Sequence, residues 1–394
     1  MVTPRTNLTR RVLAALDASP SRIPVLVGGC GTGRTTLLHQ LKDRLGRTGA
    51  VYIDVERSAT TPERFLKAIV ASSPFPVSEP APASARAAFD ATLGFFTRAK
   101  NGSGEPVTIL LDEFLELRTF ESFPGLRRVL YDLVDGLSAS GNRFVLTSRY
   151  VARTLRLLRD RSSRFEVIHM PAMTTEDTLD VIAQASGRPA GLTDASLGAA
   201  QDADLLARTV QALADGRPAY VRAMAEQLTA MRQQGRGGPS AGDPSGALAA
   251  LMDAEGRLAK LCHFTYELRL HRARGYGALK AILEILGEEE GLTLTEISQR
   301  LQRTPGSTKD YLSWLEDVDL VTARQKRYSY SDPLLRVWVR LHCRATSPSE
   351  VDLAREVHRY AHPRLPAQEP ALAMAAAGAA ADEDKKAWGI IEID

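Results

Sequence analysis

A glycine-rich stretch near the beginning of the chain has the residue types that could bind phosphate. In "VLVGGCGTGRTTLLHQL", an apolar run typical of a strand precedes Gly28 to Thr35, and a helical pattern follows. The glycines permit a tight turn with inward-pointing N–H groups, and the helix start adds partial positive charge, so an anionic phosphate chain would be held. Such loops normally carry lysine where Arg34 stands, and Thr35 offers a hydroxyl ligand for magnesium. The candidate binding residues are Gly28, Gly29, Cys30, Gly31, Thr32, Gly33, Arg34, Thr35 and Thr36.

An acidic pair follows another apolar run, in "TILLDEF". Asp112 and Glu113 would stand at the carboxyl end of a strand, which is the edge of a parallel sheet where ligands gather. There Asp112 would hold magnesium through water, and Glu113 would polarise an attacking water as general base. Either motif alone also fits a turn without a ligand. Their combination predicts a site for nucleotide hydrolysis.

Composition places the chain among ordinary globular proteins. Its 394 residues are enough for two or three domains, with 44% hydrophobic and 25% charged residues. A formal net charge of +3 does not by itself indicate a nucleic-acid or membrane partner. The three cysteines, Cys30, Cys262 and Cys343, lack metal-ligand or disulfide spacing. Together with the absence of a long apolar run, this favours a cytoplasmic location and no membrane partner.

The first half of the chain alternates short apolar runs with helical patterns. The runs are "IPVLVG", "AVYIDV", "PVTILLD", "RFVLTS" and "FEVIHM". Because they are apolar throughout, they predict strands of a parallel sheet covered by helices on both faces. We therefore expect a three-layer α/β core over residues 1–172, followed by a helical lid over 173–232. Glycine, proline and serine then predict a flexible linker over 233–247.

The second half begins with three helical patterns and continues with two polar-aromatic strands. This order resembles a winged helix-turn-helix over residues 248–345. A C-terminal helix and an alanine-rich, low-complexity tail are expected over 346–394. Helical spacing predicts a buried face in the winged segment. Its members are Leu312, Trp314, Leu315, Leu334, Leu335 and Trp338.

Taken together, the motifs resemble those of P-loop ATPases of the AAA+/STAND kind, closest to the group called archaeal-type ATPases. Beside the loop and the acidic pair, the resemblance includes "LTSR", "RDRSSRFEVIHMPAMTTED", "GRPAYVRAM" and "YSYSDPLLRVWVRL", in family order. It covers roughly Arg5 to Arg344 and implies a three-layer P-loop NTPase sheet with a helical lid and a C-terminal winged helix-turn-helix. It also implies ATP and Mg²⁺ as cofactors.

The resemblance assigns further roles to single residues. It implies that Thr147 and Arg149 sense the γ-phosphate and that Gly216 and Pro218 shape the adenine pocket, with Arg222 a weaker sensor candidate. In the family an arginine reaches a neighbour's nucleotide. Here the candidates are Arg164 first and Arg161 second, although both also fit an exposed basic helix end. A nucleotide-dependent dimer and a ring both remain open.

Arg34 changes the chemistry that such a loop can perform. Lysine is a compact charge on a flexible stem, whereas arginine is a wider planar fork. Bidentate pairing of arginine with phosphate oxygens favours nucleotide binding. The reaction is accelerated only by contacts that become stronger in the transition state. We therefore expect ATP binding with slow Mg²⁺-dependent hydrolysis that serves as a switch. The alternative is a DNA-binding transcriptional or genome-associated regulator that binds ATP with little or no hydrolysis.

The partner of the winged segment stays open between DNA and protein. Its expected recognition helix has only Lys309 beside Asp310, Glu316 and Asp317. These side chains are poorly suited to forming hydrogen bonds with base edges in the major groove. Backbone contacts to DNA could still come from basic residues elsewhere. These are Arg324, Lys326 and Arg327 in the wing, and Arg269, Arg272, Arg274 and Lys280 before it. Alternatively, the segment docks on its own ATPase core as a nucleotide-controlled latch, contacts another protein or self-associates.

Overall fold

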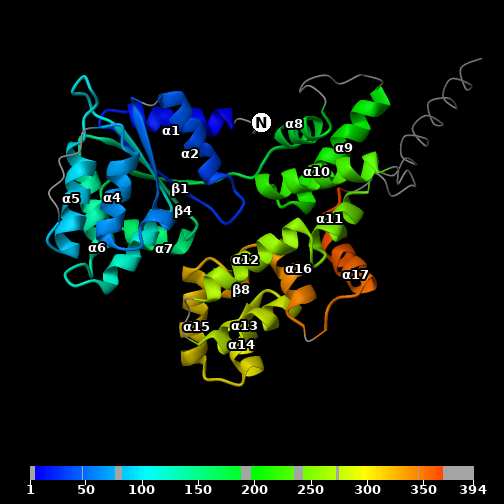
Figure 1. The fold of residues 1–394 in the computed structure, drawn as a ribbon. Helices are drawn as coiled ribbons and strands as arrows, with labels where there is room; N and C mark the ends of the chain where they lie inside the picture. Colours follow the sequence, from blue (N-terminus) through cyan, green and yellow to red (C-terminus); the bar gives the residue numbers. More distant parts are fainter. Residues whose placement is uncertain are drawn as a thin grey trace, which may run out of the picture.

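The computed structural model describes residues 5–46, 48–75, 82–187, 197–234, 243–271, 275–344 and 346–366. Most of the expected linker, at 235–242, lies outside the described residues, as do the tail from 367 to 394 and the basic residues Arg272 and Arg274. Three parts follow one another along the chain (Figure 1): a sheet part with its helices, a group of helices within residues 175–233 that we call the lid, and a C-terminal part that begins at residue 244. None of the described helices is long and apolar enough to cross a bilayer.

Five parallel strands form the sheet, in the order β2-β3-β4-β1-β5. They are β1 (Ile23–Val27), β2 (Ala50–Asp54), β3 (Thr108–Asp112), β4 (Arg143–Ser148) and β5 (Phe165–His169). Every residue of β1 and β3 is buried. This agrees with their uninterrupted apolar character and requires a cover on both faces.

Helices supply that cover. On one face, α1 (Thr6–Asp17) and α2 (Arg34–Leu45) pack against one set of strand side chains, Leu26, Leu110 and Val145. The alternate strand residues belong to the core on the other face. The elements there are α3 (Val55–Ser58), α4 (Pro62–Ser72), α5 (Ala85–Arg98), the 3-10 helix η1 (Phe114–Ser122), α6 (Val129–Ala139) and α7 (Val151–Leu158). The expected three-layer α/β fold is confirmed.

Within the described residues, three helices follow the sheet, where the sequence stops predicting strands. They are α8 (Thr175–Ala185), α9 (Leu197–Leu213) and α10 (Pro218–Gln233). The first starts with a reciprocal cap, in which Thr174 and Asp177 each accept a hydrogen bond from the other's backbone N–H. Both α9 and α10 contact α8, so the three form one compact group beside the sheet.

The C-terminal part combines helices with a small antiparallel sheet of order β6-β8-β7. Its helices are α11 (Pro244–Met252), α12 (Arg257–His271), α13 (Tyr276–Glu288), α14 (Leu294–Leu301), α15 (Pro305–Asp317), α16 (Pro333–His342) and α17 (Glu350–Ala361). Its strands are β6 (Leu292–Thr293), β7 (Val321–Arg324) and β8 (Arg327–Tyr330). Of the residues expected in its core, five are buried and Trp314 is half-buried against them.

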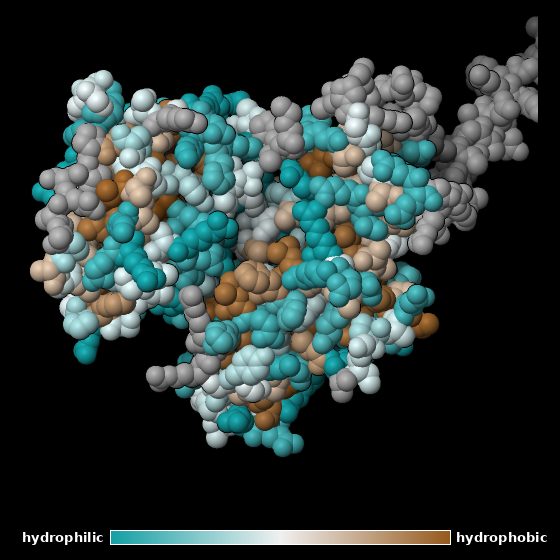
Figure 2. Space-filling view, in the orientation of Figure 1, coloured by the Kyte–Doolittle hydropathy of each residue, from teal (hydrophilic) through white to brown (hydrophobic). Residues whose placement is uncertain are grey.

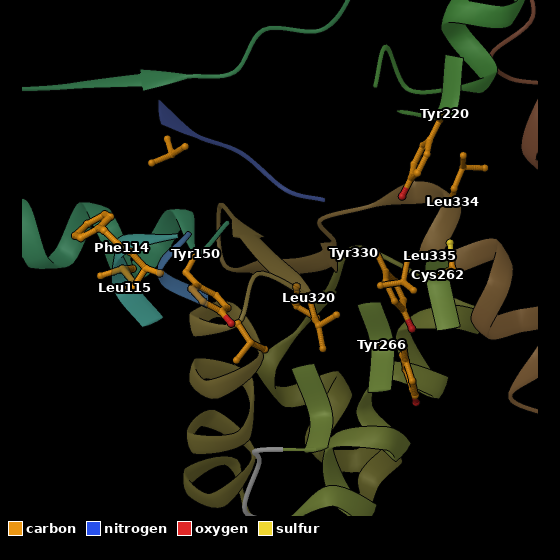
Figure 3. Close-up of a cluster of buried hydrophobic side chains, with 14 of the residues drawn as sticks. Phe114, Leu115, Tyr150, Tyr220, Cys262, Tyr266, Leu320, Tyr330, Leu334 and Leu335 are labelled. Carbon is orange, nitrogen blue, oxygen red and sulfur yellow. The ribbon is translucent and has the colours of Figure 1, made fainter. Parts of the chain in front are cut away.

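One apolar core runs from the sheet part into the C-terminal part. Figure 3 shows members of this core, with Phe114 and Tyr150 beside the sheet and Leu320 and Tyr330 in the C-terminal part. Helices α7 and α15 are in contact across the junction. The two parts are therefore docked through buried apolar surface, in addition to the polar contacts described below.

Candidate functional site

The glycine-rich loop links β1 to α2 beneath the lid. Gly31 and Gly33 have φ values of +78° and +86°, which L side chains rarely adopt. A Cβ on Gly31 would lie 3.2 Å from the Cβ of Ala219 in α10, so the loop backbone closely approaches the lid. Helix α2 starts after Gly33 without a side-chain cap. Its first N–H groups are therefore positioned to bind an anion.

Arg34 turns toward the acidic pair at the end of β3. Its Nη2 donates to Oε1 of Glu113 at 2.6 Å, and its Nη1 donates to the carbonyl oxygen of Gly29 at 3.1 Å. Only 8% of Arg34 and 5% of Glu113 are exposed. The sequence motifs predict that the two residues belong to one site, but they do not predict that Arg34 and Glu113 form an ion pair. The pair explains how an arginine is accommodated where a shorter, more flexible lysine is usual.

Glu113 is held by a second arginine as well. Its Oε2 accepts the backbone N–H of Arg149 at 3.0 Å and lies 3.3 Å from Nε of Arg149. Burial raises the pKa of Glu113, but Arg34 and Arg149 outweigh burial, so its pKa lies below the usual value. A carboxylate stabilised in this way is a weak proton acceptor. General-base catalysis by Glu113 therefore requires one of these pairs to open.

Asp112 is anchored by two hydroxyl groups. Its Oδ2 accepts from the hydroxyl of Tyr52 at 2.9 Å, and its Oδ1 accepts from Thr147. Thr147 is fully buried and its Oγ1 also accepts the backbone N–H of Glu113, so its position suits orienting the acidic pair. Asp112 and the exposed Thr35 both line the cavity described next. Carboxylate and hydroxyl oxygens are ligands that fit Mg²⁺.

A cavity of about 700 Å³ opens beside the loop. Its wall comes from the loop and α2, from α3 and the ends of β2 and β3, from Arg149 just after β4, and from the lid and α12. Figure 2 shows the molecular surface hollowed between the sheet part and the parts beside it. This volume is typical of small-molecule sites, and the combination of an uncapped helix start with apolar walls suits a nucleotide.

The lid residues have different roles at this cavity. Gly216 has a φ of +60°, and a Cβ there would lie 2.6 Å from the Cβ of Ala172. Gly216 therefore permits a close crossing between the lid and the segment leaving β5, where its carbonyl accepts the N–H of Met173 at 2.8 Å. Pro218, the first residue of α10, lines the cavity, as does Arg222.

Arg217, which the sequence reading passed over, joins three parts of the molecule. Its guanidinium donates to the carbonyl oxygen of Cys30 in the loop at 3.1 Å, to Oδ2 of Asp332 at 2.9 Å and to the carbonyl oxygen of Ser331 at 2.9 Å. The hydroxyl of Tyr220 donates to the same Oδ2 at 2.6 Å. Burial lowers the pKa of Arg217, but Asp332 outweighs burial and raises it, so Arg217 remains charged. A polar cluster thus links loop, lid and C-terminal part.

A carboxylate of the C-terminal part also approaches the loop. Oδ2 of Asp319 lies 3.5 Å from the position that a Cβ on Gly29 would take. Burial raises the pKa of Asp319 to about 6, although Arg269, Arg217 and Arg34 act in the opposite direction. An ionised carboxylate there would repel phosphate. No sequence pattern predicts this contact, because it depends on how the C-terminal part docks.

Arg164 lies away from this site. Its guanidinium donates to the carbonyl oxygens of Ser21, Ser138 and Ser140 at 2.6 to 2.9 Å, and its own carbonyl accepts the N–H at the start of β1. These contacts are at the opposite end of the strands from the loop, where Arg164 ties α6 to β1. Arg161 pairs with Asp135. Within the chain, the structure brings neither arginine to the loop.

Comparisons with known structures identify the fold. The Walker-type ATPase of Pyrococcus abyssi superposes with a TM-score of 0.59 at 15% identity, over 86% of this chain and 96% of that chain. The chain has the fold of a P-loop ATPase. Two structures match less well: the Aeropyrum pernix ORC1 protein in complex with DNA (TM-score 0.46, 15% identity, 91% and 93% of the two chains) and a RuvB mutant of Thermotoga maritima (0.42, 14%, 83% and 93%). No protein-family model and no curated protein sequence matches the chain.

Proposed function

We propose that this protein is an ATP-binding switch of the AAA+/STAND kind whose nucleotide state controls the docking of its C-terminal part. The observation that carries the proposal is the contact of Arg217 with both Cys30 and Asp332. A phosphate chain on the loop would act on the backbone that Arg217 contacts. The same arginine would transmit the change to α16, because Asp332 caps the start of that helix.

The loop and the first turn of α2 would hold the phosphates of ATP, and Thr35 with Asp112 would hold Mg²⁺. Magnesium would supply charge neutralisation at the β- and γ-phosphates. Arg34 would have to divide its donors between phosphate and Glu113. Hydrolysis is therefore slow, because Glu113 becomes an effective base only when its arginine pairs loosen.

The C-terminal part, as a winged helix-turn-helix over 248–345, would be the latch. Its expected recognition helix is α15, whose Asp317 pairs with Arg156 of α7 in the sheet part. Asp319 and Asp332 make further approaches to the loop and the lid. Acidic side chains that pair with the protein's own arginines support docking over base recognition.

DNA binding is the second candidate, and one feature supports it. Arg324, Lys326 and Arg327 are all exposed on the hairpin between β7 and β8. An exposed basic hairpin suits contacts with a phosphate backbone. In this case ATP would control affinity for DNA, and binding would weaken steeply as salt is raised.

The first experiment is calorimetric titration with Mg²⁺-ATP, together with phosphate release from purified protein and from Glu113→Gln. The wild type should bind ATP and release phosphate slowly. Glu113→Gln should bind ATP with similar affinity and lose turnover, because the amide cannot accept a proton from water. Equal turnover in both proteins would exclude Glu113 as the base. Absence of ATP binding to the wild type would overturn the proposed function itself.

A further inference from the structure

Helix α12 forms one wall of the cavity, although it belongs to the C-terminal part. The residues of α12 on this wall are Arg257, Leu261, Phe264, Thr265, Leu268 and Arg269. Successive members lie three or four residues apart, except for the adjacent pairs at 264–265 and 268–269, and this spacing describes one broad face of a helix. From Arg257 to Arg269 this face extends about 18 Å at 1.5 Å per residue. The wall is thus long enough to follow an extended nucleotide from phosphate to base.

The two ends of this wall are fixed to different elements. At one end, Arg269 is buried and donates to the backbone carbonyl of Asp319, whose side chain approaches the phosphate-binding loop. At the other end, Arg257 pairs with Glu226 of the lid helix α10. The wall therefore runs from the loop to the lid. The charged groups are at its ends and the apolar groups lie between them.

Phe264 is the unusual residue of this wall. It is 64% exposed, while its neighbours on the opposite face of α12, Cys262 and Tyr266, are buried in the core. Leu261 and Leu268 flank it along the helix, and Met173 and Val181 of the lid line the same cavity. Figure 2 shows hydrophobic surface along the hollow between the sheet part and the C-terminal part. The cavity thus combines an exposed aromatic ring with a loop suited to anions. A ligand with a flat apolar group at one end and an anionic group at the other would contact both.

We propose that Phe264 stacks on the base of the nucleotide whose phosphates the loop holds. This inference rests on the proposed function and names the residue that recognises the base. A nucleobase offers a flat π-face to an aromatic side chain, whichever base it is. The aromatic ring and the loop line one continuous cavity, so a single molecule can contact both. A nucleoside triphosphate has the base and the phosphates that these two contacts require. The C-terminal part therefore completes the site in the same chain, and base binding itself favours its docked position.

The test compares ATP with inorganic tripolyphosphate, which lacks the base, by calorimetric titration in Mg²⁺. The variants are Phe264→Ala and Phe264→Trp, and Tyr276→Ala is the matched control because it truncates an exposed aromatic residue of α13 outside the cavity. Phe264→Ala should weaken ATP binding by about tenfold or more and leave tripolyphosphate binding unchanged. Phe264→Trp should retain ATP affinity, and Tyr276→Ala should bind both probes like the wild type.

Two results obtained with Phe264→Ala would overturn the stacking role, as would a wild type that gains nothing from the base. One is ATP affinity unchanged in Phe264→Ala, and the other is an equal loss for ATP and tripolyphosphate, which would indicate damage to the loop. Because Phe264 is exposed, its truncation should keep the fold, and the circular dichroism melting curve checks this. The proposed function fails separately: a wild type that binds neither probe has no triphosphate site. A wild type that binds tripolyphosphate and ATP equally has the phosphate site without a base contact.

Discussion

Arg34 and Glu113 occupy positions that in a catalytic loop would face the phosphates and the attacking water. Replacing Arg34 by lysine removes the planar fork but retains the charge. Because lysine lacks the guanidinium fork, the variant should free Glu113 from one of its two arginine partners. It should also place a compact charge near the phosphates. We expect phosphate release by Arg34→Lys to increase by about tenfold, since a transition-state contact worth about 1.4 kcal/mol has this effect. A steady-state phosphate assay at saturating Mg²⁺-ATP measures it.

The matched control for that variant is Arg34→Lys combined with Glu113→Gln. If the gain depends on a freed general base, the double variant should lose it. ATP affinity measured beside turnover separates binding from catalysis. A lysine variant no faster than the wild type would mean that the pair between Arg34 and Glu113 does not limit hydrolysis.

The carboxylate of Asp319 approaches the glycine-rich loop, where it would repel a bound phosphate. Asp319→Asn keeps the shape and removes the negative charge, so ATP affinity at pH 7.5 should rise several-fold through lost repulsion. The gain should shrink at about pH 5, where the wild-type carboxyl is protonated. Titration of both proteins at the two pH values checks this. An equal gain at both would show that shape, rather than charge, is responsible.

The same group affects the pH dependence of stability. Burial raises the pKa of Asp319 from 3.8 to about 6 in the folded protein. The folded state therefore retains a proton that the unfolded state releases, so this contribution to stability is present below about pH 4 and is lost as pH rises through about 6. Asp319→Asn should be more stable than the wild type at pH 7, by up to about 3 kcal/mol, but not at pH 4. Urea unfolding at both pH values measures the difference.

At the scale of elements, Arg217 at the start of α10 and Asp332 at the start of α16 form a buried pair. Removing one partner leaves a buried charge, so Arg217→Met or Asp332→Asn should each lose about 3 kcal/mol of unfolding free energy. The double variant should lose clearly less than the sum. Urea unfolding of the four proteins gives the coupling energy. Additive losses would mean that the two residues act independently.

The sequence predicted the elements well where chemistry and periodicity are local. The runs at Ile23–Val27 and Thr108–Asp112 became buried parallel strands because their apolar character is independent of distant contacts. The glycine-rich loop and the acidic pair were likewise brought to one edge of the sheet. The pairing of Arg34 with Glu113 was not predictable, because it depends on a side-chain direction across 79 positions of sequence.

Contacts between parts were missed for the same reason. Arg217 and Asp332 are separated by 115 positions, and neither stands in a periodic pattern that indicates a partner. The prediction for Arg164 concerns a second chain and stays a prediction. Within this chain, its guanidinium donates to three carbonyl oxygens at the far end of the strands.

At the scale of the whole molecule, docking of the C-terminal part combines apolar burial with a few ion pairs. Burial in the continuous apolar core stabilises the docked state, while the ion pairs determine how the C-terminal part is oriented on the sheet part. A switch needs two states that differ by only a few kcal/mol, and ATP can shift them only by its difference in affinity for the two. Polar contacts at the surface of the junction are therefore the most direct way to change the balance without damaging the core.

Arg156 and Asp317 provide such a contact between α7 and α15. Arg156 is 57% exposed, so its pair with Asp317 contributes at most about 1 kcal/mol. Arg156→Glu turns this attraction into repulsion and should increase amide hydrogen exchange in both helices in the absence of nucleotide. The exchanged pair, Arg156→Glu with Asp317→Arg, should restore protection, because the attraction returns with the charges reversed. Protection restored by the exchange would tie docking to this contact, whereas equal exchange in all three proteins would show that the apolar core alone holds the C-terminal part in place.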